Sequence, residues 1–325
     1  MQAFQYASPT TLQDALDHLS GGGSEILAGG TDLMSLMKQQ IHTPNKVVGL
    51  RGIKELQGIS RAGGNLRIGA MVTIQELADN RQIQKGYPAL VQAGEGIHSP
   101  QMRSMGTVVG DLLQRPRCWY FRNGLGLLAK DGSGRALIPN GENRYHAILG
   151  NKGPAYFVNA SSFAPAMIAL GAKVKVVSKG GSREVEVAKL YRTPSADNER
   201  ELDLRPDEVV TEILLPEAGG ARSATYEVRE RQLLDWPLTA AAVSLKMSGN
   251  TVKSAVVVLG HVAPTPWRSS QAEQALAGKT VNEEVAAAAG QAAVAMATPL
   301  SQNQYKVQLA RVAVKRAVLA AVGRA

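Results

Sequence analysis

The segment EILAGGTDLMSLMKQ joins two apolar runs through a pair of consecutive glycines. Ile26–Ala28 predicts a short buried strand, and Leu33–Met37 predicts a helix. Gly29 and Gly30 can adopt backbone conformations that other residues avoid, so consecutive N–H groups can point to one side of the turn. The turn is therefore either a plain strand-to-helix connection capped by Thr31 or a cradle for a phosphate. It matches neither the GxGxxG fingerprint nor a Walker loop.

The residues around this turn predict a small α/β unit. SPTTLQDALDHL predicts a helix capped by Ser8 or a following threonine, and NKVVGL predicts a strand over Val47–Leu50. A second unit starts near Gly58, where NLRIGAMVT alternates apolar and polar residues as a half-buried strand does. Thr73 and Glu76 then form a capping box that opens a helix. Helix and strand alternation of this kind indicates an α/β arrangement.

A second glycine turn lies in SMGTVVGDLLQ, where Gly106-Thr107 and Gly110-Asp111 share one short apolar segment. It belongs to a stretch, residues 99–159, that is rich in Gly, Pro, Arg and Asn and has little periodicity, as long functional loops often are. Two glycine and threonine turns from successive units favour one long ligand lying between them. A dinucleotide with a diphosphate has that shape.

The rest of the chain predicts an antiparallel-rich sheet and terminal helices. Residues 173–187 read as a hairpin, and EVVTEILLP reads as a further strand. The composition shifts near Gly219-Gly220, so we expect domains at 1–220, divided near 57/58, and at 221–325. The last domain should hold strands over 240–247 and 252–260, then two alanine-rich helices, the second over about 304–322. The fold class expected is α+β.

Charge and cysteine usage limit the classes of function. The net charge of +9 would suit nucleic acid, an anionic ligand or an acidic partner, but the basic residues are scattered. No helix-turn-helix, zinc-finger or RNP pattern is present, so nucleic-acid binding is not expected. Cys118 is the only cysteine, which excludes an internal disulfide and an iron–sulfur cluster held by four cysteines of this chain. Widely spaced histidines without an HExxH pairing make a metal site improbable.

The start of the chain, MQAFQYASPTTLQDAL, has neither a basic n-region nor an apolar h-region, and no apolar run reaches about 18 residues. We therefore expect a cytoplasmic protein without a membrane span. QRPRCWYFRN is either a surface for an anion or partner, or an aromatic anchor with solvated arginines. No catalytic role is expected for Cys118, because no histidine is near it in the sequence. Lys306, in the last helix, is expected on a solvated or partner-facing flank.

Several longer segments carry a resemblance to a known family. They are FQYASPTTLQDAL, LAGGTDLMSLMK, LRIGAMVTIQEL, SPQMRSMGTVVGDLLQRPRCWYFR, SSFAPAMIALGAKV, YEVRERQLLDWPLTAAAVSL and GHVAPTPWRSSQAEQALAGK. In this order and spacing the chain resembles the FAD-binding medium subunit of the molybdenum hydroxylases, such as xanthine dehydrogenase, carbon monoxide dehydrogenase and bacterial aldehyde oxidoreductases. The resemblance covers essentially the whole chain. It implies the two-part FAD-binding domain also found in vanillyl-alcohol oxidase, followed by a small α+β C-terminal domain.

The resemblance also implies a set of cofactor-binding residues. The first glycine turn corresponds to the family's pyrophosphate loop, the second to another flavin-contacting turn, and a serine pair to a position that touches the sugar chain of FAD. The residues that match are Leu27, Ala28, Gly29, Gly30, Thr31, Asp32 and Leu33, then Thr107, Gly110 and Asp111, and then Ser161 and Ser162.

Three positions depart from the common pattern of the family. Val109-Gly110-Asp111 stands where many relatives have Gly-Gly-Asn, Ser162 replaces a common aspartate, and Glu227 lies where a lysine is common. These changes could weaken FAD binding. Some aldehyde oxidoreductase relatives hold an extra iron–sulfur cluster in the loop after RCWYFR, but Cys118 alone cannot support one, so we expect none here.

The function implied is that of an FAD-dependent electron-transfer subunit in a heterotrimer. Its partners would be a molybdopterin-binding large subunit and a small 2Fe-2S subunit, with NAD, oxygen or another molecule as acceptor. No catalytic side chain is expected, and the chain should not oxidise substrate alone. A flavin-free subunit that only bridges its partners stays open. A stand-alone flavin oxidase would need its own base and pocket, which the chain does not supply. Export together with a signal-bearing partner also stays open.

Overall fold

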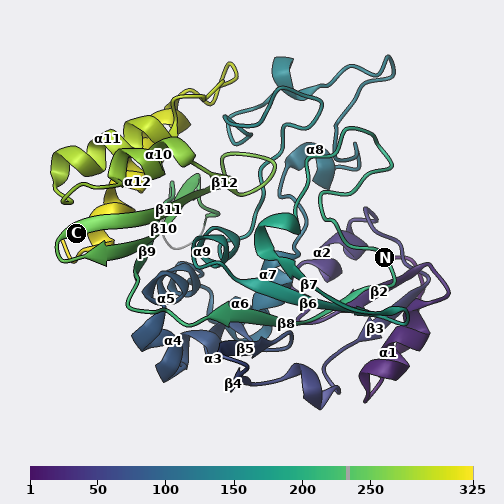
Figure 1. Cartoon of the computed structure of the whole chain (residues 1–325). Helices are drawn as coiled ribbons and strands as arrows, with labels where there is room; N and C mark the ends of the chain where they lie inside the picture. The colour runs from purple at the N-terminus through teal and green to yellow at the C-terminus, as the bar shows by residue number, and fades with distance from the viewer. Residues whose placement is uncertain (232–234, 325) are drawn as a thin grey trace.

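The computed structural model describes residues 1–231 and 235–324. Within these residues the strands form three sheets that follow one another along the chain (Figure 1). The first sheet is parallel, and the other two are antiparallel. Helices are interleaved with the first sheet, gather beside the second and cover the third, so the α+β expectation holds.

The first sheet has the strand order β1-β3-β2 and uses the first 49 residues. Its elements are β1 (Gln5–Ala7), α1 (Leu12–Leu19), β2 (Ser24–Leu27), α2 (Leu33–Lys38) and β3 (Lys46–Gly49). Thr11 begins α1, because its side chain accepts a hydrogen bond from the Asp14 N–H. The predicted helix, strand, helix, strand order is confirmed, and β1 is additional: its residues are mostly exposed and carry no apolar alternation.

The second sheet has the strand order β4-β5-β8-β6-β7. Its strands are β4 (Ile59–Ala62), β5 (Asn65–Gly69), β6 (Lys173–Ser178), β7 (Gly181–Glu186) and β8 (Val209–Pro216), with 3-10 turns η1 (Lys54–Leu56) and η3 (Val187–Lys189). Between β5 and β6 come α3 (Ile74–Asp79), α4 (Arg81–Gly86) and α5 (Pro88–Glu95). The predicted capping box is confirmed: Thr73 and Glu76 bond each other's backbone N–H groups at the start of α3. The predicted hairpin is β6 and β7.

The stretch without periodicity contains only short helices. They are α6 (Pro100–Met105), α7 (Val108–Leu112), α8 (Trp119–Arg122) and the 3-10 turn η2 (Ile138–Asn140), and α9 (Ala164–Ala169) follows. Phe121, Leu127, Leu128 and Phe157 form a small separate core beneath this stretch. Loops of this length are held by their own packing when they border a site.

The third sheet has the strand order β12-β11-β10-β9, and three helices pack on it (Figure 1). The elements are β9 (Arg222–Val228), β10 (Thr239–Ser248), β11 (Thr251–Gly260), β12 (Trp267–Arg268), α10 (Ser270–Leu276), α11 (Glu283–Ala293) and α12 (Tyr305–Ala321). Helix α5 packs against β9, and α9 packs against β10 and β11, so the C-terminal sheet is joined to the preceding part of the chain.

Two expectations about this region are corrected. Three helices follow the sheet instead of two, because the polar segment SQAEQAL also forms a helix, begun by the Ser269 side chain. Lys306 is 1% exposed and is not on a solvated flank. Its Nζ donates to the backbone oxygens of Tyr145 (3.1 Å), His146 (3.1 Å) and His261 (2.7 Å), which allows a charged group to be buried.

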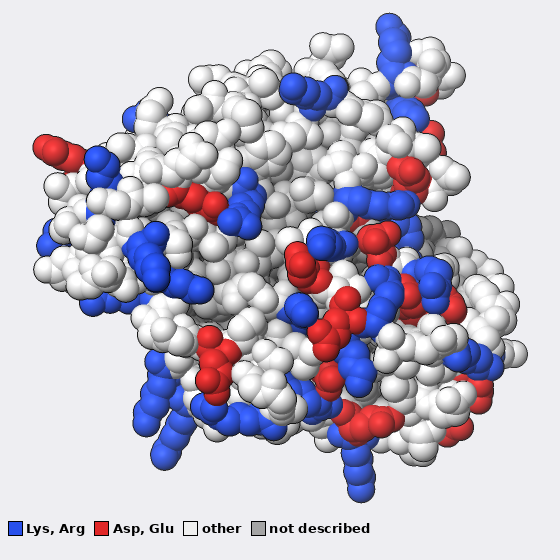
Figure 2. Space-filling model, viewed as in Figure 1, with Lys and Arg blue, Asp and Glu red and all other residues white. Residues whose placement is uncertain are grey.

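Charged side chains of both signs are interspersed on the face shown in Figure 2. Lysines and arginines stand beside aspartates and glutamates across the lower part of the view, and no block of a single sign covers it. Such mixed surfaces create only short-range fields.

Candidate functional site

The two glycine turns lie directly against each other. A Cβ atom at Gly29 would lie 1.9 Å from the Met105 carbonyl oxygen and 3.1 Å from the Gly106 Cα. A Cβ at Gly106 would in turn lie 3.6 Å from the Thr31 Oγ1. Only glycine allows the two backbones to approach this closely. The contact between the turns therefore explains Gly29, whereas the tightest contact of a Cβ at Gly106 would be with the Met102 carbonyl of α6, at 2.7 Å.

The first turn presents backbone N–H groups that the protein does not use. Across residues 1–231 and 235–324, no atom accepts a hydrogen bond from the N–H groups of Gly30, Thr31, Asp32 or Leu33. Gly30 has a φ of +75°, which bends the chain between β2 and α2. Successive unpaired N–H groups in such a bend form an anion-binding nest. A diphosphate would supply the acceptors that these groups lack.

The second turn uses its own N–H groups. The Thr107 Oγ1 accepts from the Gly110 N–H at 3.0 Å and so caps α7. The Val108 N–H donates to the Val72 carbonyl at 3.0 Å, which ties the turn to the end of β5. The second turn is thus a fixed wall, and its contribution to a ligand would come from Thr107 and the small Gly110.

Both turns line one cavity of about 200 Å³. Eight of the twelve predicted residues are in its lining: Ala28, Gly29, Gly30, Thr31, Asp32, Leu33, Thr107 and Gly110. Leu27, Asp111, Ser161 and Ser162 are not. The unused N–H groups and the cavity beside the two touching turns fit a diphosphate group in chemistry.

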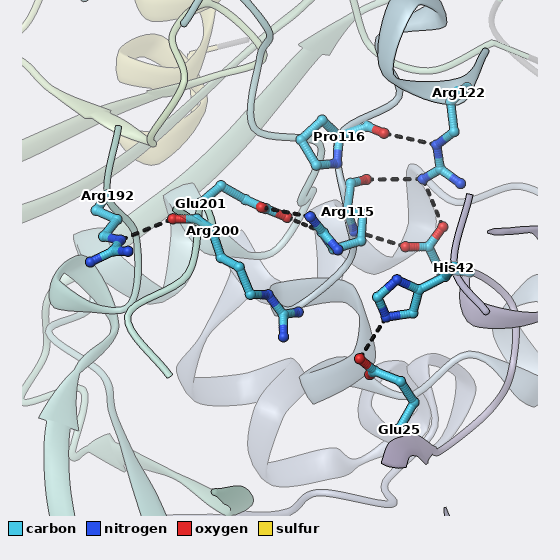
Figure 3. A network of polar contacts seen from close by, with 9 residues as sticks. Glu25, His42, Arg115, Pro116, Arg122, Arg192, Arg200 and Glu201 are labelled. Atoms are coloured by element: carbon cyan, nitrogen blue, oxygen red, sulfur yellow. Dashed lines mark hydrogen bonds and ion pairs between the residues drawn. The ribbon is translucent and has the colours of Figure 1, made fainter. Parts of the chain in front are cut away.

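Asp32 holds the arginine-rich segment that follows the second turn. Its Oδ2 accepts from the Arg115 N–H (2.8 Å), and its Oδ1 lies 2.8 Å from Arg122 Nη2 and 3.1 Å from Arg117 Nη1. Arg115 also pairs with Glu201, as Figure 3 shows. The three arginine side chains are 12–23% exposed, so the alternative in which these arginines are solvated is wrong. The carboxylate of Asp32 is an anchor for this segment.

Asp111 and Ser161 form a buried polar cluster next to the cavity. The Ser161 hydroxyl donates to the Asp111 carboxylate at 2.5 Å, and the Phe163 N–H donates to it at 3.1 Å. Burial raises the pKa of Asp111, although these hydrogen bonds act in the opposite direction. The pair joins α7 to the start of α9 and can position the second turn from behind.

Ser162 and Glu227 are also buried. The Ser162 hydroxyl has no hydrogen-bond partner among the described residues, and neither has the Glu227 Oε1. The other oxygen of Glu227 pairs with Arg229 at 2.5 Å, and burial raises the pKa of Glu227. The negative charge of Glu227, which stands where a lysine is common in the family, is therefore largely offset by Arg229. The Ser162 hydroxyl is buried close to Glu227, whose pKa it acts to lower, and Ser162 does not line the cavity.

The far end of the cavity contains residues that the sequence did not indicate. Glu25 and His42 form a pair with a distance of 2.5 Å between Oε1 and Nε2, and both line the cavity with Arg200. Burial works to raise the pKa of Glu25, but the His42 hydrogen bond and nearby positive charges lower it below its ordinary value. The Arg200 side chain extends toward the same space (Figure 3). No spacing rule links residues 25, 42 and 200, so only the fold reveals them.

Within the described ranges, no group of three or more His, Cys, Asp or Glu side chains is arranged to hold a metal ion. None of the helices in this part of the chain combines the length and apolar character needed to cross a bilayer. The site is thus one of backbone amides, small residues and arginines.

Comparison with known proteins identifies this arrangement. Residues 2–218 match the model of the FAD binding domain in molybdopterin dehydrogenase, and residues 224–321 match that of the CO dehydrogenase flavoprotein C-terminal domain. The chain is 32% identical to the FAD-binding subunit of an aldehyde oxidoreductase from Escherichia coli K12, over 96% of each chain. It is 28% identical to the carbon monoxide dehydrogenase medium chain of Hydrogenophaga pseudoflava, over 99% of this chain and 98% of that one.

The solved structures agree with the sequences. A carbon monoxide dehydrogenase structure from Hydrogenophaga pseudoflava superposes with a TM-score of 0.78 at 27% identity, covering 99% of this chain and 98% of that one. The predicted architecture, a two-part FAD-binding domain followed by a small C-terminal domain, is confirmed. The chain belongs to the family of FAD-binding medium subunits of the molybdenum hydroxylases.

Proposed function

We propose that the first glycine turn holds the diphosphate of FAD on the N–H groups of residues 30–33. This proposal rests on one observation above all: these N–H groups face a cavity and have no partner among the described residues. Leu27, Ala28 and Gly29 shape the approach to the turn, and Thr31 adds a hydroxyl donor. Thr107 and Gly110 line the opposite wall. Asp111 and Ser161 position that wall from behind, and Ser162 lies next to them in the buried segment before α9.

The arginines beside the cavity suit the charge of this ligand. Arg115, Arg200 and Arg205 line it, and Asp32 and Glu201 hold Arg115 in place. Positive charges stabilise a bound diphosphate, and the attraction is stronger where less water separates the charges. The fixed position of Arg115 means that binding does not have to order this side chain.

We further propose that the chain relays electrons within a multi-subunit complex. Bound FAD supplies the redox chemistry, because it can accept electrons singly and release them in pairs. The residues of this chain bind and orient the cofactor and limit access of water. Support comes from the relatives, which are named as subunits of an aldehyde oxidoreductase and as a medium chain of carbon monoxide dehydrogenase. The proposed partners are a molybdopterin-binding subunit and a 2Fe-2S subunit, with NAD or oxygen among the candidate acceptors.

Two measurements test this function. Purified protein should contain close to one FAD per chain, seen as the visible absorbance bands of oxidised flavin. Protein that is folded but lacks these bands, even after FAD is added, would favour the flavin-free bridging subunit instead.

The electron relay is tested by comparing which reductants bleach the flavin of the isolated chain and of the complete complex. Dithionite should bleach the flavin of the isolated chain, whereas an aldehyde should bleach it only when the molybdopterin and iron–sulfur subunits are present. Bleaching of the isolated chain by aldehyde would contradict the relay and favour a stand-alone oxidase.

A further inference from the structure

A second cavity, of about 390 Å³, shares no lining residue with the first. Its lining comes from α8, from the segment before β6, from the segment before β10, from the end of β11 and from α12. We call it the aromatic pocket, after Trp119, Tyr145, His146, Trp236 and His261, which line it. Nothing in the proposed electron relay uses this cavity.

The walls of the aromatic pocket present flat rings. The Trp119 and Tyr145 ring centroids are 5.5 Å apart with an interplanar angle of 63°, and the His146 ring lies 6.0 Å from Trp119. Trp236 is 40% exposed, and the Arg117 guanidinium lies 4.5 Å from its ring centroid. Aromatic side chains arranged in this way favour stacking and edge contacts with a planar ring.

The charged groups around the aromatic pocket already have ion-pair or hydrogen-bond partners. Arg231 pairs with Asp235 at 2.7 Å, Arg117 pairs with Asp32 at 3.1 Å, and the Tyr145 hydroxyl donates to Glu230 at 3.1 Å. The ammonium group of Lys306 donates to three backbone oxygens. An ionic ligand would have to compete with these pairs, so the pocket favours an uncharged one.

Two buried imidazoles in the lining carry an unpaired nitrogen among the described residues: Nε2 of His261 and Nδ1 of His146. His261 is 3% exposed. Burial lowers the pKa of His261 to about 3, so the imidazole is neutral near pH 7 and offers one donor and one acceptor. An unpaired polar group of this kind is costly to bury, and a ligand oxygen would remove that cost.

Cys118 and His146 complete the polar side of the pocket. The Cys118 Sγ lies 3.1 Å from the His146 Nε2. Burial raises the pKa of the thiol and lowers that of His146 to about 4, so both groups are uncharged near pH 7. They therefore add to the neutral, polarisable character of the wall.

We propose that the aromatic pocket binds a neutral, planar aromatic molecule that carries a hydroxyl or carbonyl oxygen. The ring of the ligand packs against Trp119 and Trp236, and its oxygen forms a hydrogen bond with His261. This pocket shares no lining residue with the cavity of the first glycine turn, and its proposed ligand goes beyond the electron relay.

Titration calorimetry of the full-length chain with three probes tests the proposal. The probes are 2-naphthol, naphthalene and 2-naphthoate, which share one ring system but differ in the polar group. We expect 2-naphthol to bind with a one-to-one stoichiometry and about tenfold more tightly than naphthalene, the difference of one hydrogen bond. 2-Naphthoate should bind more weakly than 2-naphthol. Equal binding of all three, or no binding of 2-naphthol, would overturn the proposal.

Variants locate the site. Trp236→Ser should weaken 2-naphthol binding about tenfold by removing one wall. His261→Phe should make 2-naphthol and naphthalene bind equally. Trp267→Phe is the matched control, because Trp267 packs near Gly150 and Pro264 outside the pocket and should leave both affinities unchanged. Thermal melts check that each variant is folded.

His261 has a φ of 60°, where Phe is strained, so the comparison of probes in the unchanged chain is an independent test. Full 2-naphthol affinity in folded Trp236→Ser would contradict the assignment.

Discussion

The two glycine turns have similar sequences but differ in how their backbone N–H groups are used. After Gly29-Gly30, the N–H groups of residues 30–33 stay unpaired and face the first cavity. After Gly106-Thr107, the Gly110 N–H is bonded to the Thr107 side chain, and the Val108 N–H is bonded to Val72. A glycine turn is thus a candidate anion site only where its amides have no partner in the protein. The first turn meets this condition and the second supports it.

The largest expected effect is the loss of FAD affinity when a side chain at position 29 forces the two turns apart. Gly29→Val would place a side chain on the Met105 carbonyl, and overpacking of this kind costs about 1–3 kcal/mol. Because about 1.4 kcal/mol is a factor of ten in affinity, FAD binding should weaken by about tenfold or more. The ratio of flavin absorbance to protein measures this after dialysis. Gly132→Ala is the control: a Cβ at Gly132 meets no atom within 4 Å and Gly132 does not line the cavity, so this variant should keep its flavin. Equal flavin loss in both variants would contradict the assignment of the first turn to the cofactor.

The next largest effect is a loss of stability when Asp32, which anchors the arginine segment to the first turn, is removed. Asp32→Ala would leave Arg117 and Arg122 without their carboxylate and the Arg115 N–H without its acceptor. Loss of one partner from a largely buried ion pair is destabilising, and we expect a decrease of about 2 kcal/mol in the free energy of unfolding. Urea unfolding measures it. Asp207→Ala, whose partner Arg205 is 61% exposed, is the control and should change stability little. No difference between the two variants would show that Asp32 is not an anchor.

A smaller effect separates capping from ligand contact. Thr107→Val and Thr11→Val each remove an N-cap hydrogen bond, at α7 and α1 respectively, and each should cost about 1 kcal/mol of stability. Only Thr107 lines the cavity, so only Thr107→Val should also lower the affinity for FAD. Thermal melts measure the loss of stability, and flavin titration measures the affinity for FAD. An unchanged FAD affinity in Thr107→Val would reduce the second turn to a purely structural support.

The smallest effect concerns the far end of the first cavity. The pKa of Glu25 is lowered in the folded chain, so its pairing with His42 stabilises the fold above the ordinary pKa of a glutamate. That stabilisation is lost as the pH falls through the lowered pKa. Glu25→Gln should therefore be less stable than the unchanged chain near pH 6, by less than about 1 kcal/mol, and the two should converge in strong acid. A constant difference at every pH would contradict the pairing.

The sequence predicted what depends on local patterns. The apolar run before Gly29, the capping box of Thr73 and Glu76, and the β6–β7 hairpin are all local, and the structure confirms them. The glycine pattern located both turns, and the family resemblance assigned their residues to the cofactor site. It did not distinguish the lining residues from Asp111 and Ser161, because hydrogen bonding between α7 and α9 depends on tertiary packing.

What the sequence missed depends on contacts between distant segments. Cys118 was judged to have no nearby histidine, yet His146 lies 3.1 Å from it across 28 residues of irregular chain. Lys306 has the pattern of a surface position, but three carbonyl oxygens from two separate segments surround its ammonium group. Glu25, His42 and Arg200 come together in the same way at the first cavity. Such groupings arise from packing, which no spacing rule describes.

The most direct test of the account is amide hydrogen exchange of the flavin-free chain with and without added FAD. Peptides covering residues 29–33 should exchange rapidly without FAD, because their N–H groups have no partner, and should become protected when FAD binds. Peptides covering residues 110–113 should change little, because the N–H groups of Gly110, Asp111 and Leu113 are already bonded to Thr107 and Val109. Protection that appears at 110–113 or elsewhere, with none at 29–33, would contradict the proposal that the first turn holds the diphosphate.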